Sequence, residues 1–155
     1  MFTDCEMIVR LILTVVLGGF VGWEREVYHK PAGFRTHILV CLGACLFTML
    51  SIYFWYSFHM DRGDPARIAA GIVMGIGFLG AGAILHEQGG VKGLTTAASI
   101  WVVASIGMAV GCGFYLGAII TTLLVVLVLF VLNKIEKYYI EKHKKGEDLK
   151  KGGSV

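Results

Sequence analysis

Long apolar blocks dominate this chain and restrict what it can fold into. A helix needs about 20 mostly apolar residues to cross the hydrocarbon core of a bilayer. Five blocks approach or reach that length: 7–23, 38–58, 67–85, 95–112 and 114–132. They lack the polar-apolar alternation of membrane β-strands, so each span is expected to be a helix. The sequence therefore predicts an all-α, polytopic transmembrane bundle of five spans.

Composition supports an integral membrane protein. The 155 residues are 56% hydrophobic and 16% charged, with a mean hydropathy of +0.72. A soluble domain has about 25% charged residues and cannot bury so much apolar surface at this size. The first span is expected to remain in the protein, because acidic Asp4 and Glu6 precede it where a removable signal peptide carries positive charge.

The distribution of basic residues predicts the orientation of the bundle. Lys and Arg concentrate in the link between the first two spans, at Lys92 in the third link, and in the tail. The opposite side has Arg62 and Arg67. By the positive-inside rule the N-terminus lies outside and the C-terminus in the cytoplasm. Residues 1–133 then form the membrane domain and 134–155 a charged cytoplasmic tail. The net charge of +3 suits an anionic inner leaflet and gives no argument for nucleic acid.

Glycines mark two of the spans as packing helices. Small residues allow transmembrane helices to approach closely. The first span carries Gly18 and Gly22, and the third carries a denser set: Gly71, Gly75, Gly77, Gly80 and Gly82. We expect the third helix to be central in the bundle. Two alternatives stay open: ordinary use of glycine in membrane helices, and a local break that exposes carbonyl groups to a polar cavity.

The link after the first span holds the candidate functional residues. It carries Glu24, Arg25, Glu26, Lys30, Arg35 and His37, and the third link adds Lys92, Thr95 and Thr96 at the start of the fourth helix. In one interpretation these groups form a structural polar cluster. In the other, Glu24 and Glu26 hold a hydrated cation such as Mg²⁺, which needs only one or two carboxylates. The bases and the helix N-terminus would then hold an anion or a lipid phosphate.

Polar groups inside the spans have simpler interpretations. Arg10 lies one turn above Glu6, as expected of an arginine that reaches toward the membrane surface and pairs there. Cys41 and Cys45 share a helical face with His37, but a metal site would need further ligands. Cys5 and Cys112 both map near the outer surface, and the sequence leaves open whether they form a disulfide. The motifs of common enzyme classes are absent, so we expect no catalysis.

Several motifs resemble the MgtC/SapB family of bacterial inner-membrane proteins. They are Gly22-Trp23-Glu24-Arg25-Glu26, Lys30-Pro31-Ala32-Gly33-Phe34-Arg35-Thr36-His37, the run from Arg67 to Ile84, and Val91-Lys92-Gly93-Leu94-Thr95-Thr96 continuing to Trp101. The resemblance implies a link to growth in low magnesium and, in some pathogens, to survival in macrophages. It also places eight residues in the family's polar motifs: Glu24, Arg25, Arg35, His37, Arg67, Lys92, Thr95 and Thr96.

Two hypotheses about function follow from this resemblance. The first is a protein of magnesium homeostasis that transports or senses the ion. The alternative is a non-transporting regulator that binds other membrane proteins, such as the ATP synthase. Many relatives carry a soluble C-terminal domain where this chain has a short charged tail, so we expect its function to reside in the bundle. Glycine-faced bundles often self-associate, which predicts a homo-oligomer, most simply a dimer.

Overall fold

The computed structural model describes residues 2–58, 64, 66–87 and 90–152. Within this part of the chain lie five helices: α1 (Asp4–Val27), α2 (Phe34–Ser57), α3 (Ala66–Gly82), α4 (Leu94–Gly111) and α5 (Tyr115–Gly152). A small antiparallel hairpin of β1 (Leu85–Glu87) and β2 (Gly90–Lys92) joins α3 to α4, with Leu85 opposite Lys92. The predicted all-α class is confirmed, with this hairpin as the addition.

Four of the helices are long and apolar enough to cross a membrane. They are α1, α2, α4 and the first part of α5, over Tyr115–Ile135. The predicted third span extends to about residue 85, and α3 ends at Gly82. The amides of Ala83 and Ile84 turn back onto the carbonyls of Gly80 and Ala81, and the chain then enters β1. The 17 residues of α3 extend about 25 Å, slightly less than the hydrocarbon core of about 30 Å.

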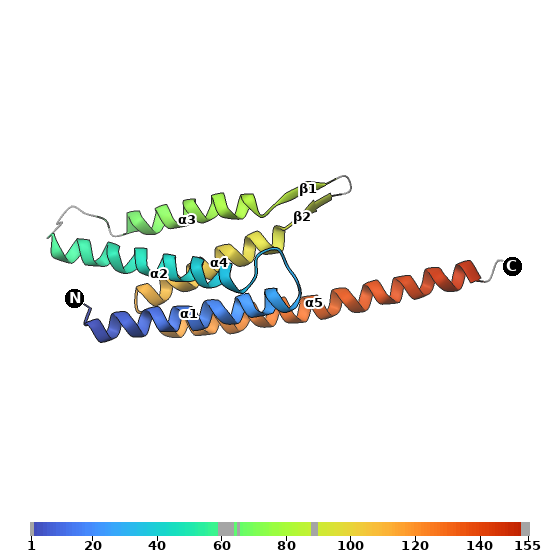
Figure 1. Ribbon diagram of the computed structural model, residues 1–155, viewed down its shortest axis with the longest axis horizontal. Coiled ribbons are helices and arrows are strands. Elements are labelled where there is room, and N and C mark those ends of the chain that lie inside the picture. The colour runs from blue at the N-terminus through green and yellow to red at the C-terminus, as the bar shows by residue number, and fades with distance from the viewer. Residues whose placement is uncertain (1, 59–63, 65, 88–89, 153–155) are drawn as a thin grey trace.

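Successive helices run in opposite directions, and this arrangement gathers the polar links. Figure 1 shows the start of α1 at one end of the bundle and the last turns of α5 beyond the other. The link between α1 and α2, the β1–β2 hairpin and the start of α4 all lie at the end where α5 continues outward. We call this the hairpin end. Its cytoplasmic location stays a prediction. Arg62, which the orientation argument uses, lies outside the described residues, as do the side chains from 136 onward.

Close contacts at glycines hold α1, α2 and α4 together. A methyl group at Gly22 would lie 2.8 Å from the Cα of Phe34, and one at Gly18 would lie 2.9 Å from the Cβ of Cys41. On α4, a methyl group at Gly107 would overlap the carbonyl oxygen of Cys41, and one at Gly111 would approach the carbonyl of Cys45. Backbone therefore packs directly on backbone along both faces of α2, as small residues at such positions permit.

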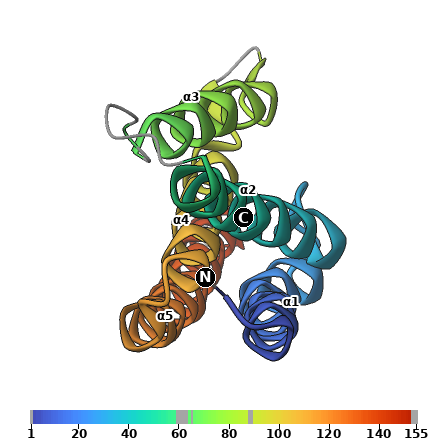
Figure 2. The ribbon, with the colours of Figure 1, turned by 90° about the vertical axis from the view of Figure 1, so that its left-hand side faces the viewer.

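The third helix lies at the edge of the bundle, so the expectation of a central position is wrong. Figure 2 shows α3 on the far side of α2 and α4 from α1 and α5. Its buried contacts come from Ile72 and Ile76, and Gly80 lies against Ala97. Apart from the backbone of α3 itself, no described atom lies within 4 Å of a methyl group added at the remaining glycines: Gly71, Gly75, Gly77 and Gly82. Gly71 and Gly75 border an apolar cavity of about 790 Å³ between α3 and α2.

Gly107→Ala should destabilise the bundle, whereas Gly75→Ala should not. The first methyl group would have to push the α2 backbone away, and overpacking of this kind costs about 1–3 kcal/mol. The second enters open space and gains helix propensity of about 0.5–1 kcal/mol. Thermal unfolding of both purified variants in detergent tests the pair. Equal unfolding temperatures would contradict the close approach of α2 and α4.

Candidate functional site

A buried arginine lies at the centre of the hairpin end. Arg25, in the last turn of α1, is only 2% exposed. Its Nη2 donates a 2.7 Å hydrogen bond to the hydroxyl oxygen of Thr96 in the first turn of α4. Its Nε has no hydrogen-bond partner within the described part of the chain. The guanidinium therefore ties α1 to α4 while part of its donor capacity is unused.

A buried carboxylate lies next to this guanidinium. Glu24 is 6% exposed, and its charge attracts that of Arg25. The Asn133 side-chain amide of α5 donates to Oε1 of Glu24 at 2.5 Å. The other oxygen, Oε2, is buried without a hydrogen-bond partner among the described residues. Three helices thus contribute charged or polar groups to one buried cluster, which we call the Arg25 cluster: Glu24, Arg25, Thr96 and Asn133.

The histidine of the polar link belongs to an adjoining network. His37 is fully buried in the first turn of α2. Its Nδ1 lies 2.9 Å from the Gly33 carbonyl oxygen, and its Nε2 lies 3.0 Å from the Ser99 hydroxyl oxygen. Ser99 in turn donates to the carbonyl of Thr96 at 2.8 Å. The Nδ1 contact thus lies within the start of α2, and the Nε2 contact joins α2 to the start of α4.

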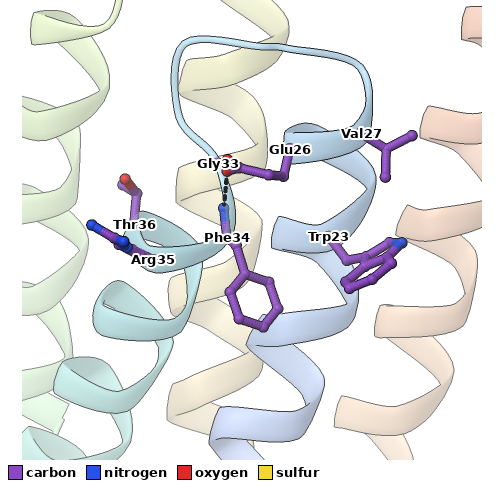
Figure 3. Close-up of a pocket in the computed structure, with 7 residues that line it drawn as sticks. All are labelled: Trp23, Glu26, Val27, Gly33, Phe34, Arg35 and Thr36. Atoms are coloured by element: carbon purple, nitrogen blue, oxygen red, sulfur yellow. Dashed lines mark hydrogen bonds between the residues drawn. The ribbon is translucent and has the colours of Figure 1, made fainter.

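The second acidic residue of the link points elsewhere. Glu26 is exposed, and its Oε2 accepts a 3.0 Å hydrogen bond from the Phe34 amide, as Figure 3 shows. It caps the start of α2, where Gly33 supplies no capping side chain. Trp23 and Phe34 lie nearby, with ring centroids 6.4 Å apart in an edge-to-face arrangement. Arg35 lies on the other side of this helix start from Trp23 (Figure 3). The structure thus separates Glu26 and Arg35 from the Arg25 cluster.

The remaining bases of the hairpin end surround a cavity of about 490 Å³. Lys30 and Lys92 line it together with Arg25, and Thr95 and Thr96 contribute the start of α4. Thr95 is exposed, whereas Thr96 is buried. The structure thus brings five of the sequence-predicted residues to one cavity.

Two arginines lie at the opposite end of the bundle. Arg10 is buried, donates to the Gly111 carbonyl at 2.6 Å and stacks over the Phe2 ring at 4.2 Å. Glu6 is 3.9 Å away and partly exposed, so Arg10 mainly fastens α1 to the end of α4. Arg67 is exposed at the start of α3, which lies at the opposite end of the bundle's long axis from the hairpin end (Figure 1). It is the one residue of the predicted site that lies at this end.

The described residues contain no group of three or more His, Cys, Asp or Glu side chains arranged to hold a metal ion. Glu24 faces α5 and Glu26 faces the start of α2, so the two carboxylates do not converge. The four cysteines are free, with Cys41 and Cys45 buried and Cys5 and Cys112 exposed.

Two residues of these networks, Asn133 and Ser99, are not among the site residues predicted from the sequence. Asn133 is the last residue of the predicted membrane domain, directly after the apolar part of α5 and before the lysines of the tail. Ser99 lies one helical turn after Thr95 and Thr96, on the face that meets His37. A polar residue at the boundary of an apolar span is the signal that could have identified both.

Comparison with known proteins gives consistent matches along most of the chain. The MgtC family matches residues 11–138. The "Putative magnesium transporter YhiD" of Escherichia coli K12 is 45% identical over 133 residues, which are 84% of this chain and 62% of that protein. Protein MgtC of Brucella abortus is 41% identical over 120 residues, covering 77% of this chain and 48% of that protein.

A third relative shows the same partial coverage. Protein SapB of Bacillus subtilis is 36% identical over 139 residues, which are 87% of this chain and 57% of SapB. The chain thus spans about half to three fifths of the length of these relatives. No solved structure matches the chain significantly.

Thr96→Val should destabilise the protein much more than Thr95→Val. The first change keeps the side-chain shape but removes the acceptor of the buried Arg25 guanidinium, and a hydrogen bond to a charged group contributes about 1.5–3 kcal/mol. Thr95 is exposed one residue earlier in the same helix, so its change should stay within about 0.5 kcal/mol. Thermal unfolding in detergent measures both. A Thr96→Val protein as stable as Thr95→Val would contradict the role given to Arg25.

Proposed function

Because this chain belongs to the MgtC family of membrane proteins, we propose that it serves magnesium homeostasis in a bacterial inner membrane. The proposal places the hairpin end in the cytoplasm and gives Mg²⁺ a transient contact with the Arg25 cluster. Its support from the comparisons is the relative YhiD, which carries the name of a magnesium transporter. Its support from the fold is the gathering of five buried polar residues at the hairpin end: Glu24, Arg25, His37, Thr96 and Ser99.

One observation carries the proposed contact with the ion. Oε2 of Glu24 is a buried carboxylate oxygen without a hydrogen-bond partner among the described residues. Mg²⁺ usually keeps several waters and takes only one or two carboxylates from a protein, so a single free oxygen is sufficient to begin a site. The positive charge of neighbouring Arg25 weakens such binding. A weakly held ion suits a protein that passes or senses magnesium.

Glu26 is the weaker candidate ligand. One of its oxygens already accepts the Phe34 amide, and the carboxylate is exposed on another face. A variant that changes Glu24 alone therefore tests the proposed ligand more directly than a variant that removes both carboxylates.

Purified protein in liposomes should pass Mg²⁺, and Glu24→Gln should abolish the flux. The amide keeps the size of the side chain but removes the charge that attracts the ion. A magnesium-sensitive dye trapped inside the vesicles measures entry. Asp4→Asn is the matched control, because it removes one acidic charge from the other end of α1 and should retain the flux. Wild-type flux equal to that of empty vesicles would reject transport.

A second candidate function is a regulator that binds other membrane proteins without moving an ion. It is favoured by Gly71 and Gly75, which lie on one side of α3 and border an apolar cavity of about 790 Å³ between α3 and α2. Such a face allows close approach by a transmembrane helix of another protein or of a second copy. A bundle that uses this face would explain why α3 carries so many small residues at the edge of the fold.

A photoreactive residue at Met74 should capture that partner in cells. Met74 is 79% exposed on α3 and has room for the probe. The regulator hypothesis predicts a discrete adduct with a different membrane protein, which the same probe at buried Val103 should not form. An adduct of twice the chain mass would indicate the predicted dimer instead. Capture of lipid alone would count against both forms of protein association.

A further inference from the structure

The cavity at the hairpin end has a charge pattern suited to an anion. Arg25, Lys30 and Lys92 line it, and its lining within the described part of the chain includes no acidic side chain. The volume of about 490 Å³ exceeds what an isolated ion needs and is enough for a small phosphorylated headgroup. The cavity therefore has room and charge for a phosphate group with an attached organic part.

The start of α4 presents hydrogen-bond donors to the same space. Gly93 precedes the helix with φ of 92° and gives it no side-chain cap. The first helical hydrogen bond runs from the Ala97 amide to the Gly93 carbonyl, so the amides of the first turn are left for another acceptor. These amides and the helix dipole favour negative charge, and phosphate groups bind at such positions.

Arg25 supplies an observation independent of the helix terminus. It is buried, it lines the cavity, and its Nε has no partner among the described residues. A guanidinium carries five N–H donors, and Arg25 uses one of them on Thr96. Burial of a charged group with unused donors is costly, and an anion in the cavity would offset that cost.

The opposite wall of the cavity is apolar. It is formed by Val128, Leu129 and Leu132 of α5, of which Val128 and Leu132 are also exposed to the surroundings of the bundle. A cavity with basic lining residues beside an exposed apolar helix face suits an amphiphile better than a free ion. The acyl chains would follow α5 into the bilayer while the phosphate enters the cavity.

We propose that this cavity binds a phosphate-bearing anion, delivered as the headgroup of an anionic phospholipid. Lys30, Lys92 and the first-turn amides of α4 hold the phosphate, and Arg25 supports it from beneath. The inference stands apart from the proposed contact with magnesium, since Glu24 does not line the cavity and the test contains no divalent cation.

Short-chain phospholipids added to purified protein in detergent test the proposal. The rise in unfolding temperature with ligand concentration gives an apparent affinity. Dioctanoyl phosphatidylglycerol should bind at least about fivefold more tightly than dioctanoyl phosphatidylcholine, and Lys30→Gln or Lys92→Gln should weaken it about fivefold. Lys134→Gln is the matched control. It removes an exposed lysine next to Asn133 but outside the cavity, and should leave the affinity within about twofold.

Three results would overturn parts of this proposal. Unchanged phosphatidylglycerol affinity in both Lys30→Gln and Lys92→Gln would reject the cavity as the site. An equal loss in Lys134→Gln would reduce the effect to general surface charge. Inorganic phosphate that stabilises the protein as well as phosphatidylglycerol does at the same concentration would reject the lipid as the source of the anion.

Discussion

Burial of the Arg25 guanidinium is the constraint on which the hairpin end depends. A charge removed from water must find partners nearby, and here they come from distant parts of the chain. Thr96 accepts from it at the start of α4, while Glu24 balances its charge and takes the amide of Asn133 on α5. The end of α1, the start of α4 and the middle of α5 are thereby fixed relative to one another, which creates both the cluster and the cavity beside it.

The close backbone contacts of the bundle make that burial geometrically feasible. Gly22 brings the end of α1 against Phe34 at the start of α2, and Gly107 brings α4 against the middle of α2. With the three helices at this distance, His37 reaches Ser99 directly. The apolar packing and the polar network therefore support each other. A functional group placed here is held rigidly, as binding sites in membrane bundles require.

The sequence predicted the fold class and the location of the polar residues better than it predicted their partners. Apolar blocks define helices because their length must match the bilayer. Glycine spacing shows which face can approach another helix but not which helix occupies it, and so α3 was placed at the centre instead of the edge. The bond from Arg25 to Thr96 joins residues 71 positions apart, and local patterns carry no information about such pairs. The bond from Asn133 to Glu24 likewise joins residues 109 positions apart.

A double-mutant cycle between Arg25 and Thr96 tests the central claim most directly. The free energy of unfolding in detergent is measured for Arg25→Met, Thr96→Val and the double variant. If the guanidinium and the hydroxyl interact as the structure has them, the two changes should be coupled by about 1–3 kcal/mol. Additive effects within about 0.3 kcal/mol would show that the two side chains act independently, and would contradict the account of the hairpin end.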